Sequence, residues 1–410
     1  MGEYGLRING QRLLQRLEQL AAIGRQADGS CCRLALTDED CQGRDLVVSW
    51  MRALGLAVQV DQVGNVFGTR TGREDVAPVM TGSHLDTVAT GGKYDGSYGV
   101  LAGLEVLETL AEAGVRTRRP LTIAIFSNEE GVRFQPDMLG SLVYAGGLAV
   151  QDALGIPATD GPLFGAELAR IGYAGTLGPG AILPHAFVEL HIEQGPILDQ
   201  EGGVLGAVDR LQGISWQEIT LRGVANHAGT TPMRLRRDAA VGAARIACFV
   251  RDLVDELGGA QVGTVGALTL VPNLINVIPG KAVLTVDLRN TEEAVLRDAE
   301  DRLAAFLQRL ATREGLEVAT RRLARFTPVT FDPSIVQVII DAATALGHPI
   351  QRMISGAGQD AQMVARRCPS AMIFVPSIGG ISHNPAERTA PEHLEIGGNV
   401  LLQSLLTLAQ

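Results

Sequence analysis

Three histidines and two carboxylates in this chain have side chains of the types that bind divalent metal ions. The candidate ligands are His84, Asp95, Glu130, His191 and His383. Imidazole and carboxylate suit zinc, manganese, cobalt or nickel, and the choice among these metals stays open because the set has no thiolate. If Asp95 bridges, the set suffices for two ions, which at about 3.5–4 Å apart can activate water near neutral pH and polarise the bond that it attacks. The set therefore predicts metal-dependent hydrolysis.

Two further acids adjoin the candidate ligands. Asp86 follows His84 by two residues, so its carboxylate could accept the other ring N–H of that histidine and fix its tautomer. Glu129 precedes Glu130 but cannot share its role, because adjacent residues at a strand end point in different directions. A free carboxylate beside the attacking water is a ready general base, which could later pass the proton to the leaving nitrogen. We therefore expect Glu129 to be the base.

Short apolar runs rich in branched side chains predict the buried strands that would position these residues. The runs are "APVMTGSH" before His84, "LTIAIFSNEE" ending in Glu129 and Glu130, "AFVELH" ending in His191, and "AMIFVPSIGGISH" leading through a glycine-rich turn to His383. Ligands of open α/β sheets bind outside the carboxyl ends of strands, so these four ends could converge on one crevice. A strand-end histidine or a solvated acidic pair is ordinary by itself, but their joint occurrence favours a metal site.

The order of the predicted elements indicates two domains. Apolar spacing predicts a helix over residues 98–113, between the first two of these strands, and a packing helix near the N-terminus. From about Gly213 the order becomes strand, helix, strand, strand, helix, strand, as in the ferredoxin-like split unit. We therefore expect an α/β protein with one domain at 1–212 and 329–410, and an inserted α+β domain at 213–328.

Composition narrows the class of protein. The 410 residues are 46% hydrophobic and 20% charged, which is typical of a soluble protein. The formal net charge of −10 argues against nucleic acid or an anionic membrane as the main partner. The N-terminus lacks the apolar run of a signal peptide, and no stretch could span a bilayer, so a cytoplasmic location is expected. The five cysteines form no Cys-X-X-Cys pair, so neither a disulfide framework nor a thiolate zinc site is expected.

Over nearly its full length the chain resembles the dinuclear-metal amidohydrolases of the M20 group, in the hydantoinase/carbamoylase branch. That branch contains N-carbamoyl-L-amino acid hydrolases, β-ureidopropionases and allantoate amidohydrolases. The segments that carry the resemblance are "GSHLDTVATGGKYDGSYGVLAG", "NEEGVRF", "ELHIEQGPILD", "NHAGTTPM", "VPNLINVIPG", "DLRN", "SGAGQDAQM" and "GGISHNPAE". As a set, these segments are very specific.

The resemblance implies a mixed-sheet, metallopeptidase-like catalytic domain, with the inserted domain as both a lid and a dimerisation surface. It also implies two divalent ions per subunit. The ligands of one ion would be His84, Asp95 and His191, and those of the other would be Asp95, Glu130 and His383. Glu129 would be the general base of a homodimeric enzyme.

The resemblance further implies residues that bind the substrate. His227 would steady the developing oxyanion, Asn276 and Arg289 would bind the carboxylate, and Gln194 would contact the ureido end. A guanidinium matches a carboxylate bidentately, which lysine cannot do, so Arg289 predicts a substrate with a free carboxylate; an ordinary strand-end ion pair is the alternative. A ureido carbonyl is a poor electrophile, so a donor such as His227 would lower the barrier where charge develops.

One loop departs from the pattern. Gln359 of "SGAGQDAQ" stands where relatives commonly carry histidine, and glutamine cannot titrate near neutral pH. This excludes a protonation-dependent role at that position and bears on substrate preference. Gly356 and Gly358 would still let backbone amides approach a ligand.

The predicted function is hydrolysis of the ureido C–N bond of N-carbamoyl amino acids to the amino acid, carbon dioxide and ammonia. "GGKYDG", "YGVLAGLEVL" and "NEEGVRF" look closer to the carbamoylase and β-ureidopropionase members than to the allantoate enzymes. Allantoate amidohydrolase stays an alternative, since allantoate would offer a carboxylate and two ureido groups to Arg289 and Gln194. An M20 exopeptidase or acylase is a second alternative. A non-catalytic binding protein is disfavoured, because Glu129 and all five ligands are present.

Overall fold

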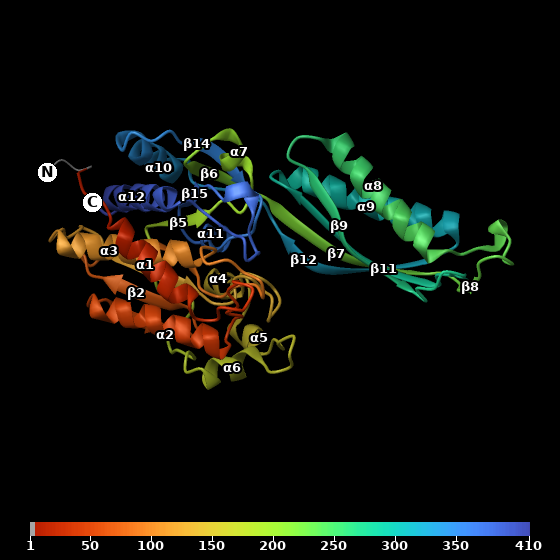
Figure 1. The fold of residues 1–410 in the computed structure, drawn as a ribbon, viewed down its shortest axis with the longest axis horizontal. Coiled ribbons are helices and arrows are strands. Elements are labelled where there is room, and N and C mark those ends of the chain that lie inside the picture. The colour runs from red at the N-terminus through yellow and green to blue at the C-terminus, as the bar shows by residue number, and fades with distance from the viewer. Residues whose placement is uncertain (1–4) are drawn as a thin grey trace. The chain divides into compact units, whose positions relative to one another are not determined.

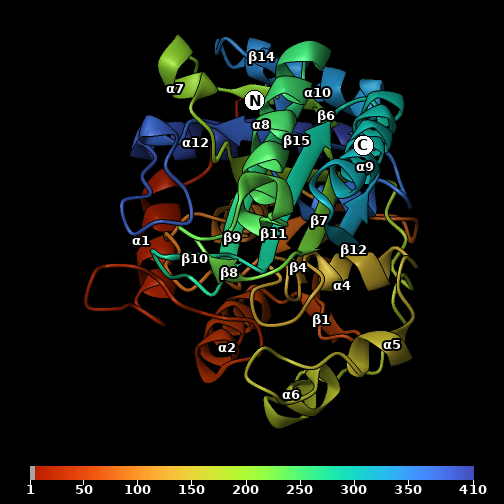
Figure 2. The same cartoon turned by 90° about the vertical axis from the view of Figure 1, so that its right-hand side faces the viewer.

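The computed structural model describes residues 5–410. The chain forms two compact units (Figures 1 and 2), one made of residues up to Asp209 together with Thr330–Gln410 and the other of Arg210–Val329. We call these the main unit and the inserted unit. The sequence placed the inserted domain at 213–328, a range that lies within the inserted unit. The predicted fold class, α/β with a mixed sheet and an inserted α+β unit, is confirmed.

The main unit is built around a mixed sheet. Nine strands of the described residues form it, in the order β1-β2-β4-β3-β5-β15-β6-β13, with β14 paired to β6. Their bounds are β1 (Ala57–Val60), β2 (Val66–Arg70), β3 (Val79–His84), β4 (Leu121–Phe126), β5 (Ala186–Ile192), β6 (Gly206–Leu211), β13 (Val329–Thr330), β14 (Gln351–Ser355) and β15 (Ser370–Val375). The neighbours β4, β3, β5 and β15 run parallel, whereas β2 runs antiparallel to β1 and β4, and β6 runs antiparallel to β15. The four parallel strands therefore end at the same edge of the sheet.

Helices cover this centre of the sheet. Every residue of β3, β4, β5 and β15 is buried, which requires cover on both faces. The predicted helix is α3 (Ser97–Glu112), which contacts β3, β4, β5 and α12 (Pro391–Leu408). A Cβ at Gly99 of α3 would overlap the carbonyl oxygen of Leu190, so glycine lets the helix lie directly on β5.

The predicted N-terminal packing helix is α1 (Gly10–Ala21), which contacts α3 and α12. The side chain of Asn9 caps it by accepting from the amide of Arg12, and its buried leucines are Leu13, Leu17 and Leu20. The other helices of the main unit are α2 (Asp38–Ala53), α4 (Leu139–Tyr144), α5 (Val150–Leu154), α6 (Phe164–Arg170), α7 (Ile197–Glu201), α10 (Pro333–Ala345) and α11 (Asp360–Val364), with a 3-10 turn, η2 (Ile378–Gly380). Across residues 5–410, no helix combines the length and apolarity needed to cross a membrane.

The inserted unit has the predicted β-α-β-β-α-β order. Its elements are β7 (Gly213–Arg222), α8 (Ala239–Leu257), β9 (Val262–Val271), β11 (Lys281–Asn290), α9 (Glu293–Glu314) and β12 (Glu317–Phe326). The strands pair antiparallel in the order β12-β7-β11-β9, and both helices pack against this sheet. A short pair, β8 (Asn226–His227) with β10 (Val277–Ile278), and a 3-10 turn, η1 (Met233–Leu235), complete the unit.

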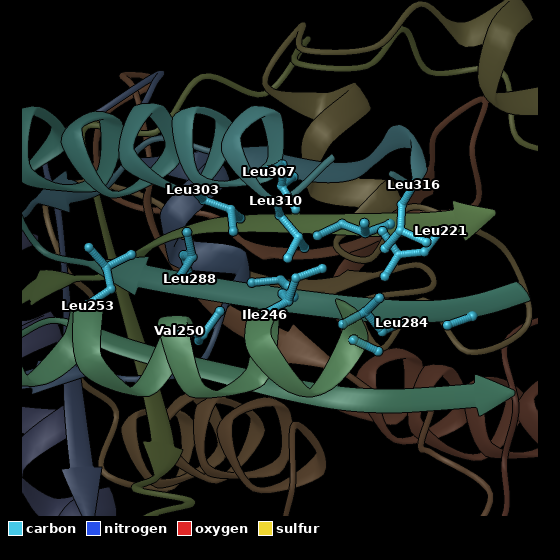
Figure 3. Packing of buried hydrophobic residues seen from close by; sticks show 14 of the residues in the cluster. Leu221, Ile246, Val250, Leu253, Leu284, Leu288, Leu303, Leu307, Leu310 and Leu316 are labelled. Carbon is cyan, nitrogen blue, oxygen red and sulfur yellow. The ribbon is translucent and has the colours of Figure 1, made fainter. Parts of the chain in front are cut away.

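Alternation along β11 explains the core of this unit. Residues of β11 are buried at every second position, which directs Leu284 and Leu288 toward the helices. There they join leucine, isoleucine and valine side chains such as Ile246 of α8 and Leu303 of α9 (Figure 3). The inserted unit thus has a hydrophobic core of its own.

Candidate metal centre

The carboxyl ends of the parallel strands bring the candidate ligands together. His84 ends β3, His191 lies near the end of β5, and Glu130 follows β4. Asp95 lies in the loop before α3, and His383 follows β15 and η2. Potential ligand atoms of His84, Asp95 and His191 all lie within 4.8 Å of one another, and so do those of Asp95, Glu130 and His383. Residues far apart in the sequence thus form two groups that share Asp95.

The two oxygens of Asp95 face different groups. Its Oδ1 lies 3.2 Å from Nε2 of His191 and 3.6 Å from Nε2 of His84. Its Oδ2 lies 3.2 Å from Nε2 of His383. That same nitrogen of His383 lies 3.2 Å from Oε2 of Glu130. The carboxylate of Asp95 is therefore placed as a bridge between the groups.

Hydrogen bonds orient two of the imidazoles. Nδ1 of His84 donates to the main-chain oxygen of Asp86 at 2.8 Å, and Nδ1 of His191 donates to that of Ile192 at 2.9 Å. In its neutral form, each ring therefore has its lone pair on Nε2, the atom that faces Asp95. At His191 this lone pair also accepts from the amide of Gly96, at 3.0 Å. A Cβ at Gly96 would overlap the ring of His84, and its φ of 61° also favours glycine.

The charges of the cluster fit divalent cations. Burial and then the nearby Asp95 raise the pKa of Glu130 to about 8. The hydrogen bond with Asp95 raises the pKa of His383 to about 9, despite partial burial. Burial alone would lower the pKa of His84, but Glu129 and Asp95 raise it well above its usual value. Several carboxylates packed this closely repel one another, and bound cations would relieve that repulsion. The oxygen and imidazole donors suit such ions.

The prediction for the carboxylate of Asp86 is wrong. The ring N–H of His84 reaches the main-chain oxygen of Asp86, because the chain turns that carbonyl back toward the imidazole. The buried carboxylate instead accepts the backbone amide of Glu129 at 3.3 Å and that of Glu130 at 3.2 Å. Asp86 therefore holds the backbone of both glutamates.

Glu129 lies beside the cluster but belongs to neither group of potential ligands. Its Oε2 lies 3.5 Å from Nε2 of His84. Burial, and then the neighbouring acids, raise the pKa of Glu129 well above its usual range. The preceding Asn128 has a φ of 54°, a left-handed conformation that asparagine tolerates better than most residues. Its amide donates to the carbonyl oxygen of Phe134 at 2.9 Å, which braces the turn that carries both glutamates.

Two predicted glutamines form a chain of hydrogen bonds to Asp95. Gln194 donates from Nε2 to Asp95 Oδ2 at 2.8 Å, and Gln359 donates from Nε2 to Gln194 Oε1 at 2.7 Å. Gln359 is buried directly before α11, and Gly358 precedes it. A Cβ at Gly358 would lie 2.9 Å from Cε of Met138, so this position is tightly packed.

Sequence reasoning missed two acids that support the cluster. The buried Glu387 accepts the amides of Tyr94 at 3.0 Å and Asp95 at 3.3 Å, and it accepts from the hydroxyl of Ser382 at 2.9 Å. It thereby holds the loop that carries Asp95, and its place in "GGISHNPAE" was the available clue. Glu189 is buried within β5 and accepts from Ser83 and from the amide of Ala361, both at 2.7 Å. Nothing in the apolar run around Glu189 indicated this role.

The remaining predicted residues belong to the inserted unit. His227 and Asn276 are both exposed and lie close together, since His227 pairs with Val277 and the amide of Ala228 donates to the main-chain oxygen of Asn276 at 3.0 Å. Nδ1 of His227 accepts two backbone amides, which leaves its hydrogen on Nε2. Arg289 is on another strand, β11, one residue before its end.

Arg289 already contacts a carboxylate in the structure. Its Nε lies 3.1 Å from both oxygens of Asp287, and its second terminal nitrogen lies 2.9 Å from Oδ2. Its guanidinium carbon lies 5.7 Å from the ring centroid of Trp216. The strand-end ion pair that the sequence leaves open is therefore present.

The sequence of this chain matches peptidase family M20/M25/M40 over residues 80–407, and the chain belongs to that family. It is 42% identical to the N-carbamoyl-L-amino-acid amidohydrolase of Rhizobium meliloti, over 98% of this chain and 97% of that protein. It is 37% identical to the allantoate amidohydrolase of Bacillus subtilis (strain 168), over 96% of each chain. Its fold matches a crystal structure of an amidase of the hydantoinase/carbamoylase family from Burkholderia multivorans, with a TM-score of 0.93, 45% identity and 98% of both chains covered.

These comparisons confirm the predicted family, its hydantoinase/carbamoylase branch and the class of enzyme, a hydrolase. Enzymes of this family generally depend on metal ions. Among residues 5–410, the two groups that share Asp95 are the candidate ligands of such ions.

Proposed function

We propose that this protein is a metal-dependent amidohydrolase that cleaves the ureido C–N bond of N-carbamoyl amino acids. The products would be the free amino acid, carbon dioxide and ammonia. The observation that carries the proposal is the shared carboxylate of Asp95 between two ligand groups, with the separate carboxylate of Glu129 beside it. The names of the relatives support carbamoyl amino acids as the substrate class.

Two divalent ions would be held at this centre. The ligands of one would be His84, Asp95 and His191, and those of the other Asp95, Glu130 and His383. When bound, such ions act as Lewis acids toward the carbonyl oxygen and make water a better nucleophile near neutral pH. Zinc, manganese, cobalt and nickel all suit the donor set.

Glu129 would move the proton. Its carboxylate is outside both ligand groups, so it can take a proton from the attacking water and pass it to the leaving nitrogen. Asp86 would act through Glu129 and Glu130, because it accepts both of their backbone amides.

Residues of the inserted unit would recognise the substrate. Arg289 would bind the carboxylate alongside or in place of Asp287, with help from Asn276. Nε2–H of His227 would donate to the carbonyl oxygen, where negative charge develops during attack. Gln194 and Gln359, with Gly358, would face the ureido end.

The inserted unit would also serve as a lid and as the surface of a homodimer. Its separate hydrophobic core would allow it to move as a body. Sedimentation of the purified protein would test the dimer. Scattering with and without a substrate analogue would test closure, and identical dimensions would contradict it. We expect the enzyme to act in the cytoplasm.

Allantoate hydrolysis is the second candidate function. It is favoured by the 37% identity to an allantoate amidohydrolase. Allantoate has a carboxylate for Arg289 and ureido groups for Gln194, so the same residues would serve. An M20 exopeptidase or acylase would use the same metal centre on a different amide.

The test is ammonia release by metal-stripped protein reloaded with manganese, cobalt or zinc. The substrates are several N-carbamoyl-L-amino acids, N-carbamoyl-β-alanine and allantoate, with a dipeptide and an N-acyl amino acid assayed in parallel for amine release. Metal-dependent ammonia release from a carbamoyl amino acid would support the proposal. Release from allantoate alone would favour the second candidate. Hydrolysis of only the dipeptide or acyl compound would contradict both.

A further inference from the structure

The hydrogen-bond chain from Gln359 through Gln194 to Asp95 has a fixed direction. A carboxylate that serves as a metal ligand is ionised and can only accept hydrogen bonds. Gln194 must therefore turn its NH2 group toward Asp95, 2.8 Å away, and its oxygen toward Gln359. Gln359 must then present its own NH2 group to that oxygen, at 2.7 Å. The direction follows from Asp95 and does not depend on how either amide is assigned.

This direction leaves one atom without a partner. Oε1 of Gln359 has no hydrogen-bond partner among residues 5–410, and the whole residue is 1% exposed. A buried amide oxygen without a donor is destabilising. A ligand that brings an N–H group to this oxygen would satisfy it.

We propose that Oε1 of Gln359 accepts a hydrogen bond from the terminal NH2 of the substrate's carbamoyl group, which makes Gln359 a specificity-determining residue. This inference rests on the proposed function and specifies that the enzyme recognises the terminal NH2 group of the substrate. The terminal NH2 is bonded to the carbonyl carbon that must react near Asp95, and Gln359 is two hydrogen bonds away from Asp95.

The proposal separates carbamoyl compounds from close analogues. A formyl or acetyl group has a hydrogen or a methyl where the carbamoyl group has NH2. Either analogue would leave Oε1 of Gln359 buried and unpaired, and sites built to bond an N–H discriminate strongly for that reason. Since glutamine does not titrate, this preference does not change with pH near neutrality.

The experiment compares two substrates on the full-length, metal-loaded enzyme. For wild type and Gln359→Met, kcat/KM is measured on an N-carbamoyl-L-amino acid and on the N-formyl derivative of the same amino acid. Methionine has nearly the same length but neither amide group. We expect the carbamoyl value to fall roughly 10–100-fold and the formyl value to fall much less, because only the carbamoyl compound loses a partner. Gln200→Met, an exposed substitution on α7, is the matched control and should change neither.

A second variant separates the acceptor from the donor. Gln359→Glu keeps an oxygen for the substrate but gives up the donor to Gln194. The values of kcat/KM on the carbamoyl and the formyl substrate should therefore both fall. The ratio of the carbamoyl value to the formyl value should stay as in wild type. If the wild type does not turn over the formyl compound, the inhibition constant of that compound against carbamoyl hydrolysis is measured in place of kcat/KM. Metal content and thermal unfolding are measured for each variant, and the Glu variant carries the test if the Met variant does not fold.

Equal losses on both substrates in Gln359→Met would overturn the proposal, since Gln359 would then act only by positioning Gln194. An unchanged kcat/KM on the carbamoyl substrate in Gln359→Met would overturn it as well. So would a fall in the ratio of carbamoyl to formyl kcat/KM in Gln359→Glu. These outcomes differ from failure of the proposed function, in which the wild type itself releases no ammonia from carbamoyl amino acids.

Discussion

The main unit and the inserted unit bury different kinds of side chain. At the edge of its sheet, the main unit buries a cluster of charges that includes His84, Asp95 and His191. The core of the inserted unit is apolar (Figure 3), and its polar candidates His227 and Asn276 are exposed. Burying charge is costly unless each group is paired or binds a metal, whereas an apolar core needs no ligand. The cluster is therefore the part of the molecule whose stability should depend on bound ions.

The largest expected effect is loss of turnover when the base is removed from the main unit. Glu129→Gln should lower kcat about 100–10,000-fold, because the amide cannot take a proton. Metal content should be unchanged, since Glu129 belongs to neither ligand group. Steady-state kinetics with elemental analysis checks both, and Glu39→Gln on the exposed face of α2 is the control. Unchanged turnover would contradict the role of Glu129 as the general base. Loss of metal from the variant would indicate that Glu129 is a metal ligand.

The affinity for metal should rise with pH. Without an ion, the pKa of His383 is about 9 and that of Glu130 about 8, both raised above their usual values. Below these values the groups hold protons that must leave before they can bind a metal, so affinity is lowest at low pH and rises until pH passes about 9. We expect about tenfold tighter manganese binding per pH unit for each proton released. Calorimetry at pH 7, 8 and 9 measures this, and a flat profile would contradict it.

The strand ends and the order of elements could be predicted from the sequence because both depend on local patterns. The apolar runs before His84, Glu130 and His191 are buried strands. The parallel pairing of the first two follows from the helix between them. Convergence of these ends is a property of parallel sheets, so the neighbourhood of the ligands followed from topology.

The roles of individual polar atoms could not be predicted in the same way. Asp86 was expected to use its carboxylate on His84, but its main-chain oxygen does this, because the turn after β3 decides which oxygen faces the ring. The bond from Gln359 to Gln194 joins residues 165 positions apart, and no local pattern indicates such a contact. Glu189 is a buried acid inside an apolar strand, where the pattern predicts only packing.

Truncating the apolar core should test the inserted unit without touching the metal centre. Leu284→Ala should lower the free energy of unfolding by about 2–5 kcal/mol, because it leaves a cavity beneath α8 and α9. Metal content should not change. Urea denaturation gives the free energy, and Leu268→Ala is the control, since Leu268 on β9 is 50% exposed. If added metal restored the lost stability, the stability of the core of the inserted unit would depend on the metal centre, contrary to this expectation.

A smaller effect is expected at the proposed carboxylate-binding residue. Arg289→Lys should lower kcat/KM about 10–100-fold, mainly through KM, because an ammonium cannot form the bidentate contact. Metal content should be unaffected, as Arg289 lies in the inserted unit. Arg322→Lys, exposed on β12, is the matched control. An equal loss on a carbamoyl amine that lacks the carboxylate would show that Arg289 has only a structural role.

The smallest effect is expected from chemical labelling of two cysteines, one in each unit. Labelling of the native protein should leave its activity intact. Cys248 is exposed on α8, whereas Cys368 is buried in the main unit, where burial raises its pKa to about 11. At pH 8 the thiolate of Cys368 is on the order of one part in a thousand, and the thiolate is the reactive form. Iodoacetamide should therefore label Cys248 in the folded protein and Cys368 only after unfolding, as read by peptide mass spectrometry. Equal labelling of the native protein would mean that the main unit opens around β15 more readily than its fully buried strands indicate.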